Sequence, residues 1–215
     1  MVSQNFVYLS VVRYAIRTLP KDNNIRNLKL KMEIYKLDND FEYKNITGIV
    51  ELTISQFSDF KGQKLRENWN RPQFDILENI TKVKSEMNNE KTKKLNFDIR
   101  CYGNILIVKS KHLEIFTAID TEILPVKINS INEDFSFVNV LSILEAINFK
   151  NMDYKQSMEM LKSNNINFIK DNIQENLIFR DKKIINFYYC TNHFKKIVEE
   201  NGLTGVKFTK VGTAN

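Results

Sequence analysis

The sequence predicts an α+β fold, with a small antiparallel N-terminal sheet and C-terminal strand and helix units packed around one buried helix. Three observations lead to this prediction. Residues 135–149 repeat apolar side chains at the three-and-four spacing of a helix face. Apolar and charged side chains alternate over residues 28–34, as in a half-buried strand. Near residues 110 and 191, an apolar run is followed by a hydroxyl residue and then by a helical pattern.

Composition favours one ordered domain. The chain has 215 residues, of which 42% are hydrophobic, and this is enough for a sizeable core. Only six glycines and three prolines occur, which argues against a linker-rich or disordered chain. We expect a single domain over residues 1–215 with two lobes, an N-terminal sheet lobe over residues 1–73 and a second lobe over residues 74–215.

The charge balance is basic but dispersed. Lysine and arginine number 32 against 26 acidic residues, which gives a net charge of +6. Such a balance favours acidic partners in general, but scattered charges do not make a nucleic-acid footprint. No basic segment precedes a signal-like apolar run, and no apolar stretch is long enough to span a bilayer, so we expect a soluble, cytoplasmic protein. Cys101 and Cys190 lie in apolar, strand-like runs, as buried thiols without a disulfide do in a reducing cytosol.

The N-terminal region contains the candidate strands of the small sheet. Residues 6–12 are rich in β-prone side chains, and residues 28–34 alternate between apolar and charged. Residues 50–54 alternate in the same way after Thr47 and Gly48. Short alternating strands of this kind are typical of an antiparallel sheet with one covered face.

Residues 57–74 form a polar, irregular loop that carries the candidate partner-binding residues Arg66, Trp69 and Arg71. Tryptophan and arginine are enriched at the energetic centres of protein interfaces, so this loop is a candidate contact surface. The alternative is that Trp69, the only tryptophan of the chain, fills the core beneath the loop, because large apolar side chains are usually buried.

The middle of the chain mixes short elements with a polar run. We expect a short helix to begin within residues 74–80 and a surface insertion at residues 81–94. Residues 105–108 read as a buried strand, and Ser110 is placed to cap a helix that follows it. Residues 123–128 read as a strand in which Pro125 marks an edge or a strand start.

The predicted buried helix at residues 135–149 has apolar residues on most of its circumference. Its covered face includes Val140, Leu141 and Leu144, so an aspartate at Leu141 or Leu144 is expected to unfold the protein. A short helix is predicted at residues 154–161, and a strand at residues 177–180.

The closing segment gives the most specific local prediction. Thr191 is placed to cap a helix, and Gly202 follows that helix at a position suited to a left-handed backbone conformation. Leu203 then contacts Val198 in a Schellman motif, and residues 206–208 return as a strand.

No catalytic or metal-binding constellation is recognisable. Cys190, His193, Cys101 and His112 are residue types that zinc accepts, but they lack the paired close spacing of a structural zinc site. An enzyme that uses Cys190 or His193 stays an alternative, as does nucleic-acid binding. Because no phosphate-binding glycine loop and no glycine-rich nucleophile elbow is present, we expect no cofactor and no metal.

Several of these stretches together resemble immunity protein family eleven of bacterial polymorphic toxin systems. The resemblance covers roughly residues 74–211 and is clearest at the C-terminus, where Thr191 stands at a position that often has serine in the family. The matching features are a Ser-started helix, a Pro-Val strand, an Asn-Val-Leu stretch, an Ile-Phe-Arg strand and a closing Gly-Leu-Thr-Gly turn. In this chain they are Ser110, Pro125, Val126, residues 139–141, residues 178–180 and residues 202–205.

The resemblance implies a cytoplasmic binding protein that neutralises a cognate toxin, the toxin domain of a secreted bacterial effector. It implies no enzyme activity and transfers no catalytic residue to this chain. The matching residues lie mostly at predicted caps, turns and core positions, so the resemblance leaves the binding surface to be located. Arg66, Trp69 and Arg71 are the candidates for it.

Overall fold

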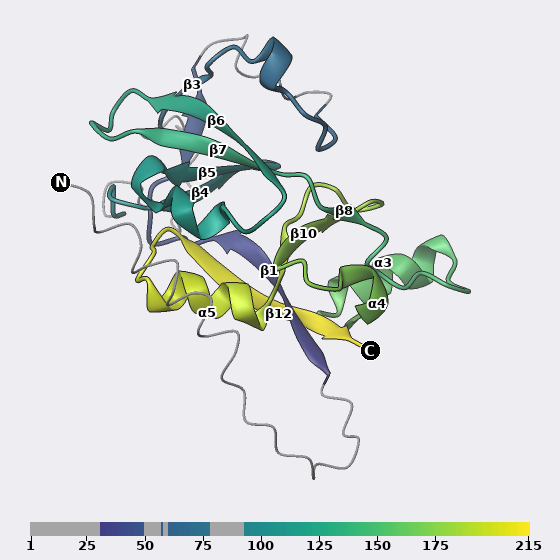
Figure 1. Cartoon of the computed structure of the whole chain (residues 1–215). Helices are drawn as coiled ribbons and strands as arrows, with labels where there is room; N and C mark the ends of the chain where they lie inside the picture. Colours follow the sequence, from purple (N-terminus) through teal and green to yellow (C-terminus); the bar gives the residue numbers. More distant parts are fainter. Residues whose placement is uncertain (1–30, 50–56, 58–59, 78–92) are drawn as a thin grey trace, which may run out of the picture. The chain divides into compact units, whose positions relative to one another are not determined.

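The computed structural model describes residues 31–49, 57, 60–77 and 93–215, and these residues lie in one compact unit, Lys31–Asn215. Within the described residues the fold is mostly sheet, with two six-stranded sheets and a few short helices (Figure 1). The predicted strands at residues 6–12 and 50–54, and residues 81–92 of the predicted insertion, lie outside the described residues.

The prediction of a buried helix at residues 135–149 is wrong, and with it the α+β class. Phe135–Val140 forms strand β7, and all six of its residues are buried. Ile143–Leu144 forms β8. A strand that is covered on both faces is apolar at nearly every position, so its sequence also satisfies the three-and-four spacing of a helix. Phe137, Val140 and Ile147 were correctly identified as core, whereas Leu141 and Leu144 are only partly buried, and the periodicity does not distinguish a buried strand from a buried helix.

The first sheet joins the start and the end of the described chain. In the described residues its spatial order is β8-β10-β11-β1-β12-β9, antiparallel from β10 to β12 and parallel at both margins. Besides β8, its strands are β10 (Ile178–Asp181), β11 (Tyr189–Thr191), β1 (Met32–Asn39), β12 (Val206–Ala214) and β9 (Ile166–Phe168).

The second sheet has the order β2-β3-β6-β7-β5-β4 in the described part of the chain. Besides β7, its strands are β2 (Ile46–Gly48), β3 (Gln73–Ile76), β6 (Thr121–Ile128), β5 (Ile105–Lys109) and β4 (Ile99–Tyr102). The predicted separate N-terminal sheet is therefore wrong, because β1 and β2 belong to different sheets. β3 also replaces the helix that was expected to begin within residues 74–80.

The helices are short. Those of the described residues are the 3-10 helices η1 (Arg66–Asn68) and η3 (Ser110–Phe116) and the α-helices α3 (Tyr154–Lys162), α4 (Lys170–Ile173) and α5 (Asn192–Glu200). Ser110 begins η3 without capping it, because its hydroxyl lies 3.2 Å from the Ser136 hydroxyl instead. No helix in the described ranges is long and apolar enough to cross a membrane.

The ends of α5 confirm the predicted local signals. The hydroxyl of Thr191 accepts a hydrogen bond from the amide of Phe194 at 3.5 Å. Gly202 has φ +63, and the amide of Leu203 donates to the carbonyl of Val198 at 3.1 Å, which is the long hydrogen bond of a Schellman motif. The predicted helix at residues 154–161 and the strands at residues 105–108, 177–180 and 206–208 are also confirmed.

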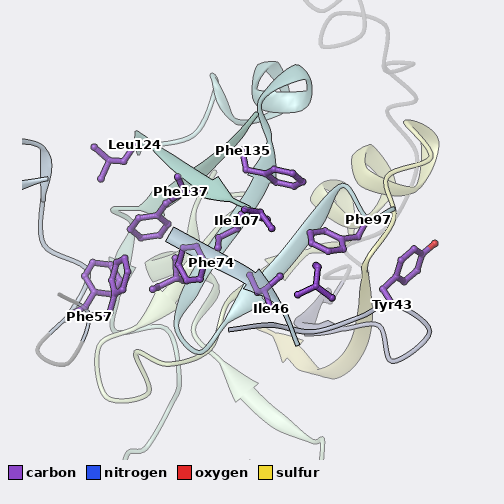
Figure 2. Packing of buried hydrophobic residues seen from close by; sticks show 14 residues of the cluster. Tyr43, Ile46, Phe57, Phe74, Phe97, Ile107, Leu124, Phe135 and Phe137 are labelled. Atoms are coloured by element: carbon purple, nitrogen blue, oxygen red, sulfur yellow. The ribbon is translucent and has the colours of Figure 1, made fainter. Parts of the chain in front are cut away.

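Three apolar clusters stabilise the unit. One lies on a single face of the second sheet, and Figure 2 shows Phe57, Phe74 and Phe137 at one end of it and Tyr43 at the other. A second cluster contains residues of both sheets and of α5, including Leu37, so it packs the sheets against each other. The third covers part of the other face of the first sheet.

A buried arginine joins the two sheets by hydrogen bonds. Arg100 of β4 is fully buried, and its guanidinium donates to the carbonyl oxygens of Asp40 at 2.7 Å and Gly205 at 2.8 Å. These carbonyls follow β1 and precede β12. Buried donors and acceptors that find each other avoid the large cost of leaving polar groups unpaired.

Candidate functional site

Residues 64–72 lie along an edge of β6 that β3 leaves open, and we call them the edge segment. β3 pairs with β6 only at Lys127 and Ile128. Further along β6, the Nε1 of Trp69 donates to the carbonyl of Pro125 at 2.9 Å, and a guanidinium nitrogen of Arg71 donates to the carbonyl of Val126 at 3.1 Å. Pro125 thus occupies a strand edge, one of its two predicted positions, where a missing N–H costs no ladder hydrogen bond.

The other end of the edge segment is held by a buried carboxylate. Both oxygens of Glu122 accept backbone hydrogen bonds, from the amide of Leu65 at 2.8 Å and from the amide of Arg66 at 2.9 Å. Glu122 is only 7% exposed. Hydrogen bonds to an ionised acceptor are stronger than neutral ones, so this carboxylate fixes the backbone at the start of η1.

A chain of buried polar groups continues from Glu122 into the first sheet. The amide nitrogen of Asn139 donates to Glu122 at 3.2 Å and to the carbonyl of Gln63 at 2.9 Å. The amide oxygen of Asn139 accepts from the guanidinium of Arg180 at 3.2 Å, and Arg180 also donates to the hydroxyl of Tyr188 at 3.0 Å. The backbone of the edge segment is therefore connected to β10 by hydrogen bonds that run through the side chains of Glu122, Asn139 and Arg180.

Arg180 has no carboxylate partner among the described residues. Its guanidinium lies 4.9 Å from the ring centroid of Phe60 and 4.6 Å from that of Tyr188. Burial lowers the pKa of Arg180 and raises that of Tyr188, because both charged forms lose their hydration. Both rings attract the cation through cation–π contacts, and these partly compensate for the absence of a carboxylate partner among the described residues.

Trp69 is half-buried, and its ring packs on the core of the second sheet. Its centroid lies 5.9 Å from that of Phe57 and 5.9 Å from that of Phe137. With its Nε1 bonded to Pro125, the indole is fixed at both its apolar and its polar side. The core-filling alternative for Trp69 thus describes most of its contacts, while part of the ring stays accessible.

The two arginines of the edge segment are exposed and border different surface hollows. The guanidinium of Arg66 has no hydrogen-bond or ion-pair partner among the described residues, and it borders a hollow lined by Lys64, Glu67, Asp120 and Leu141. Arg71 borders a second hollow at the other end of β6 and lies 3.9 Å from Asp134. The structure therefore brings the three predicted residues onto one segment, with Trp69 between the arginines in sequence.

Sequence reasoning missed Glu122, Asn139 and Arg180, which hold this segment in place. Each lies inside a strand beside at least one apolar residue: Asn139 lies between buried valines, Glu122 precedes Ile123, and Arg180 follows the buried Phe179. A polar residue at an interior position of an apolar run is expensive to bury unless a partner is close by. That local contrast is the signal by which all three residues could have been found.

The alternative site at Cys190 and His193 has unfavourable geometry for nucleophilic chemistry. Cys190 is fully buried, and burial raises the pKa of its thiol, while His193 is exposed. Burial also raises the pKa of Cys101 to about 12. Both thiols are free but disfavour the reactive thiolate form. In the part of the chain that the structure describes, no three histidine, cysteine or acidic side chains form a group able to hold a metal ion.

Comparison with known proteins gives one family. A family profile described as the Immunity protein family (Imm11) matches residues 33–213, a span that runs from β1 to β12 and contains all of the edge segment. No curated protein matches the chain.

Proposed function

The chain belongs to the Imm11 immunity protein family, and from this premise we propose that it is a cytoplasmic protein that neutralises a cognate toxin by binding it without covalent chemistry. Membership of the family supports toxin immunity in general and a non-enzymatic role. The toxin proposed here is the toxin domain of a secreted bacterial effector, encoded beside this chain.

We propose the edge segment as a surface that contacts the toxin, through Arg66, Trp69 and Arg71. The observation that carries this proposal is that Arg66 is exposed, its guanidinium has no partner among the described residues, and its backbone amide is fixed by Glu122. A binding loop that is already ordered loses little conformational entropy when the partner docks. Arginine supplies directional hydrogen bonds, and the accessible part of Trp69 supplies apolar contact area.

The net charge supports the choice of partner. At +6 the chain attracts acidic surfaces, and long-range attraction speeds the encounter of two proteins even where it adds little to final affinity. An acidic region on the toxin is therefore the surface that we expect the two arginines to meet.

The test is a protection assay combined with direct binding. The chain is co-expressed with the toxin domain encoded by the neighbouring gene, and affinity is measured with the purified proteins. We expect the chain to restore growth, and Arg66→Ala together with Arg71→Ala to lower affinity about thirtyfold, which is about 2 kcal/mol. The melting temperature should change little, because both arginine side chains are exposed.

Matched controls separate the interface from general charge. Lys155→Ala together with Lys196→Ala removes two exposed cations from α3 and α5, and affinity should stay within about twofold of the wild type. Trp69→Ala tests packing as well as binding, because its ring contacts the core. Full protection by the arginine variant would remove the edge segment as the interface, and failure of the wild type to protect would contradict the proposed function.

A further inference from the structure

One face of the first sheet carries lysines and aromatic rings that point to a second contact surface. In the strand register, Lys36 of β1 lies opposite Tyr189 of β11 and Thr209 of β12, and Asp38 lies opposite Lys207. Residues that are directly opposite in neighbouring strands project from the same face of a sheet. These five side chains therefore share a face.

The opposite face is the one that packs against the second sheet and α5. Leu37 and Phe208, which alternate with Lys36 and Lys207 along their strands, belong to the cluster that contains residues of both sheets. Figure 1 shows α5 beside β1 and β12. The third apolar cluster covers this face at Ile34, Tyr189 and Val211, whereas Lys207 is exposed and Lys36 is partly exposed, so the face is only partly covered.

Two exposed phenylalanines lie at this face, each beneath a lysine ammonium group. The nitrogen of Lys207 lies 4.5 Å from the ring centroid of Phe41, and that of Lys36 lies 5.0 Å from the ring centroid of Phe187. Phe41 is 65% exposed and Phe187 is 44% exposed. The ring of Phe187 also contacts Tyr189, with centroids 6.5 Å apart, which ties it to the same face.

A third pair continues the pattern at the margin of the face. The ammonium of Lys183 lies 4.8 Å from the ring centroid of Phe149. Phe149 packs against the same apolar cluster as Tyr189. Repeated placement of a cation over a ring keeps flexible lysine side chains near fixed positions, which lowers the entropy that they lose on binding.

The face has an excess of positive charge. Lys207 has no carboxylate partner among the described residues, whereas Lys36 lies 3.1 Å from Asp38. Asp38 also accepts a hydrogen bond from the hydroxyl of Thr209 at 3.1 Å. With Lys183 and the buried Asp181 included, three lysines lie at this face against two aspartates, so the charge complementary to it is negative.

We propose that the face formed by Lys36, Phe41, Phe187 and Lys207, here called the aromatic–lysine face, binds an acidic surface of the cognate toxin. This inference rests on the proposed function and adds a second contact area to it. Carboxylates of the toxin pair with the two ammonium groups, and apolar atoms beside them cover the exposed rings. Aromatic side chains, phenylalanine included, are enriched at protein interfaces, and exposed apolar area surrounded by polar residues is typical of interaction sites.

A protein partner fits this face better than a nucleic acid does. Proteins that bind single strands stack bases on the open faces of aromatic rings. Here each exposed phenylalanine has a ring face already occupied by an ammonium group of the same chain. A carboxylate approaches the ammonium without displacing it, whereas a base must compete with it for that ring face.

The experiment measures the affinity of the full chain for the toxin domain encoded by the neighbouring gene, at low and at physiological salt. We expect Lys207→Glu to weaken binding about tenfold or more, with the larger effect at low salt. Lys196→Glu on α5 is the matched control, because it makes the same charge change at an exposed position of another element, and it should stay within about twofold. The double variant Phe41→Ala and Phe187→Ala should also weaken binding about tenfold.

The possible results separate this inference from the proposed function. If the wild type binds the toxin and the Lys207→Glu and double phenylalanine variants bind it equally well, the role proposed for the aromatic–lysine face is wrong. The proposed function is then unaffected. If the wild type does not bind, the proposed function falls and this inference falls with it. If the wild type binds an oligothymidylate probe tightly and Lys207→Glu abolishes that binding, the face binds nucleic acid instead. Should the phenylalanine variant fail to fold, as judged by circular dichroism, Lys207→Glu alone decides.

Discussion

Glu122 shows how a single buried charge can shape a surface. Its carboxylate accepts two backbone hydrogen bonds from the edge segment and one from Asn139. Three donors offset the loss of hydration that a carboxylate suffers on burial. The residue therefore keeps Arg66 in position from beneath the surface.

Replacing Glu122 by glutamine tests this role. Glutamine has one acceptor oxygen where glutamate has two, so the amide of Leu65 or that of Arg66 loses its partner. We expect Glu122→Gln to lower the free energy of unfolding by about 1–3 kcal/mol. Hydrogen exchange of these two amides should speed up, and exchange in α5 should not change beyond the effect of the lower stability. If both amides of the variant exchange at the wild-type rate, the carboxylate does not hold the edge segment in place.

Predictability at the residue scale depends on the distance between partners in the sequence. Thr191 and Gly202 were predicted correctly, because a helix cap and a left-handed turn are satisfied by neighbours a few residues away. Glu122 binds amides more than fifty residues earlier in the chain, and Arg180 binds Asn139 from another sheet. No local pattern contains such partners. The roles proposed for Arg66, Trp69 and Arg71 stay predictions.

Among the elements, β7 shows where periodicity fails. Its six residues are buried on both faces, with Phe137 in the cluster of the second sheet and Val138 in the cluster between the sheets. An uninterrupted apolar run fits a helix and a strand equally well. By contrast, α3 and α5 were predicted correctly, because polar residues interrupt their apolar positions at helical spacing.

A pair of neighbouring substitutions distinguishes a strand from a helix at this position. Val140 is fully buried between the sheets, whereas Leu141 is only partly buried and lines the hollow beside Arg66. We expect Val140→Asp to prevent folding, since an unpaired carboxylate in the core costs several kcal/mol. Leu141→Asp should fold and lose about 1 kcal/mol, in contrast to the unfolding that the helix prediction required. Circular dichroism and thermal melting measure both, and equal loss of structure would favour the helix.

The edge segment is irregular apart from the single short 3-10 helix η1. It takes the place of a further stretch of β3 beside β6, with the side-chain donor of Trp69 where a strand would supply a backbone amide. Covering an open strand edge with a fixed loop also protects it from unwanted pairing with other chains. The polar sequence of residues 57–74 predicted a loop, and residues 60–72 are irregular apart from η1, but Gln73 and Phe74 belong to β3, and the sequence did not predict the place of the segment beside β6.

Across the whole molecule, Asp98 joins the two sheets by electrostatic contacts. Its carboxylate accepts from the hydroxyl of Thr204 at 2.7 Å, just before β12 of the first sheet. It also lies 3.5 Å from the ammonium of Lys109 and 3.2 Å from the ring of His112, both attached to the second sheet. Burial raises the pKa of Asp98, but the hydrogen bonds from Thr204 and the charges of Lys109 and His112 outweigh burial and lower the pKa below its ordinary value.

This lowered pKa predicts a pH-dependent stability. A carboxyl group whose pKa is lower in the folded state stabilises the fold above its unfolded pKa of about 3.9, and this contribution is lost as the pH falls through the folded value. We expect Asp98→Asn to lower the free energy of unfolding by about 1–3 kcal/mol at neutral pH, and the difference from the wild type to shrink below about pH 4. Urea unfolding at both pH values measures this.

The exposed Glu175→Gln variant is the control for that measurement. Glu175 has no partner among the described residues, so its removal should change the stability little at either pH. A difference between Asp98→Asn and the wild type that stays constant down to pH 3 would show that the ionised carboxylate does not stabilise the fold.

Fold class was the least predictable property, because it depends on which strands meet. The sequence located most of the strands in the described residues, yet β1 pairs with β11 and β12 from the far end of the chain, not with its neighbour β2. Alternating residues in β1 indicate a strand but do not name its partner. The family resemblance supplied the general role, which the family profile confirms, without supplying the topology.

The pairing of β1 with β12 has a consequence for synthesis on the ribosome. Met32 pairs with Ala214, so the longest strand pair of the first sheet cannot form completely until nearly all of residues 31–215 have been translated. Until then the apolar face of β1 that carries Leu37 lacks the strand beside it, and long-range pairing of this kind is slow to form. Closure of the first sheet therefore comes late in the synthesis of residues 31–215, and a chain that stops before Val206 leaves β1 without its longest partner strand.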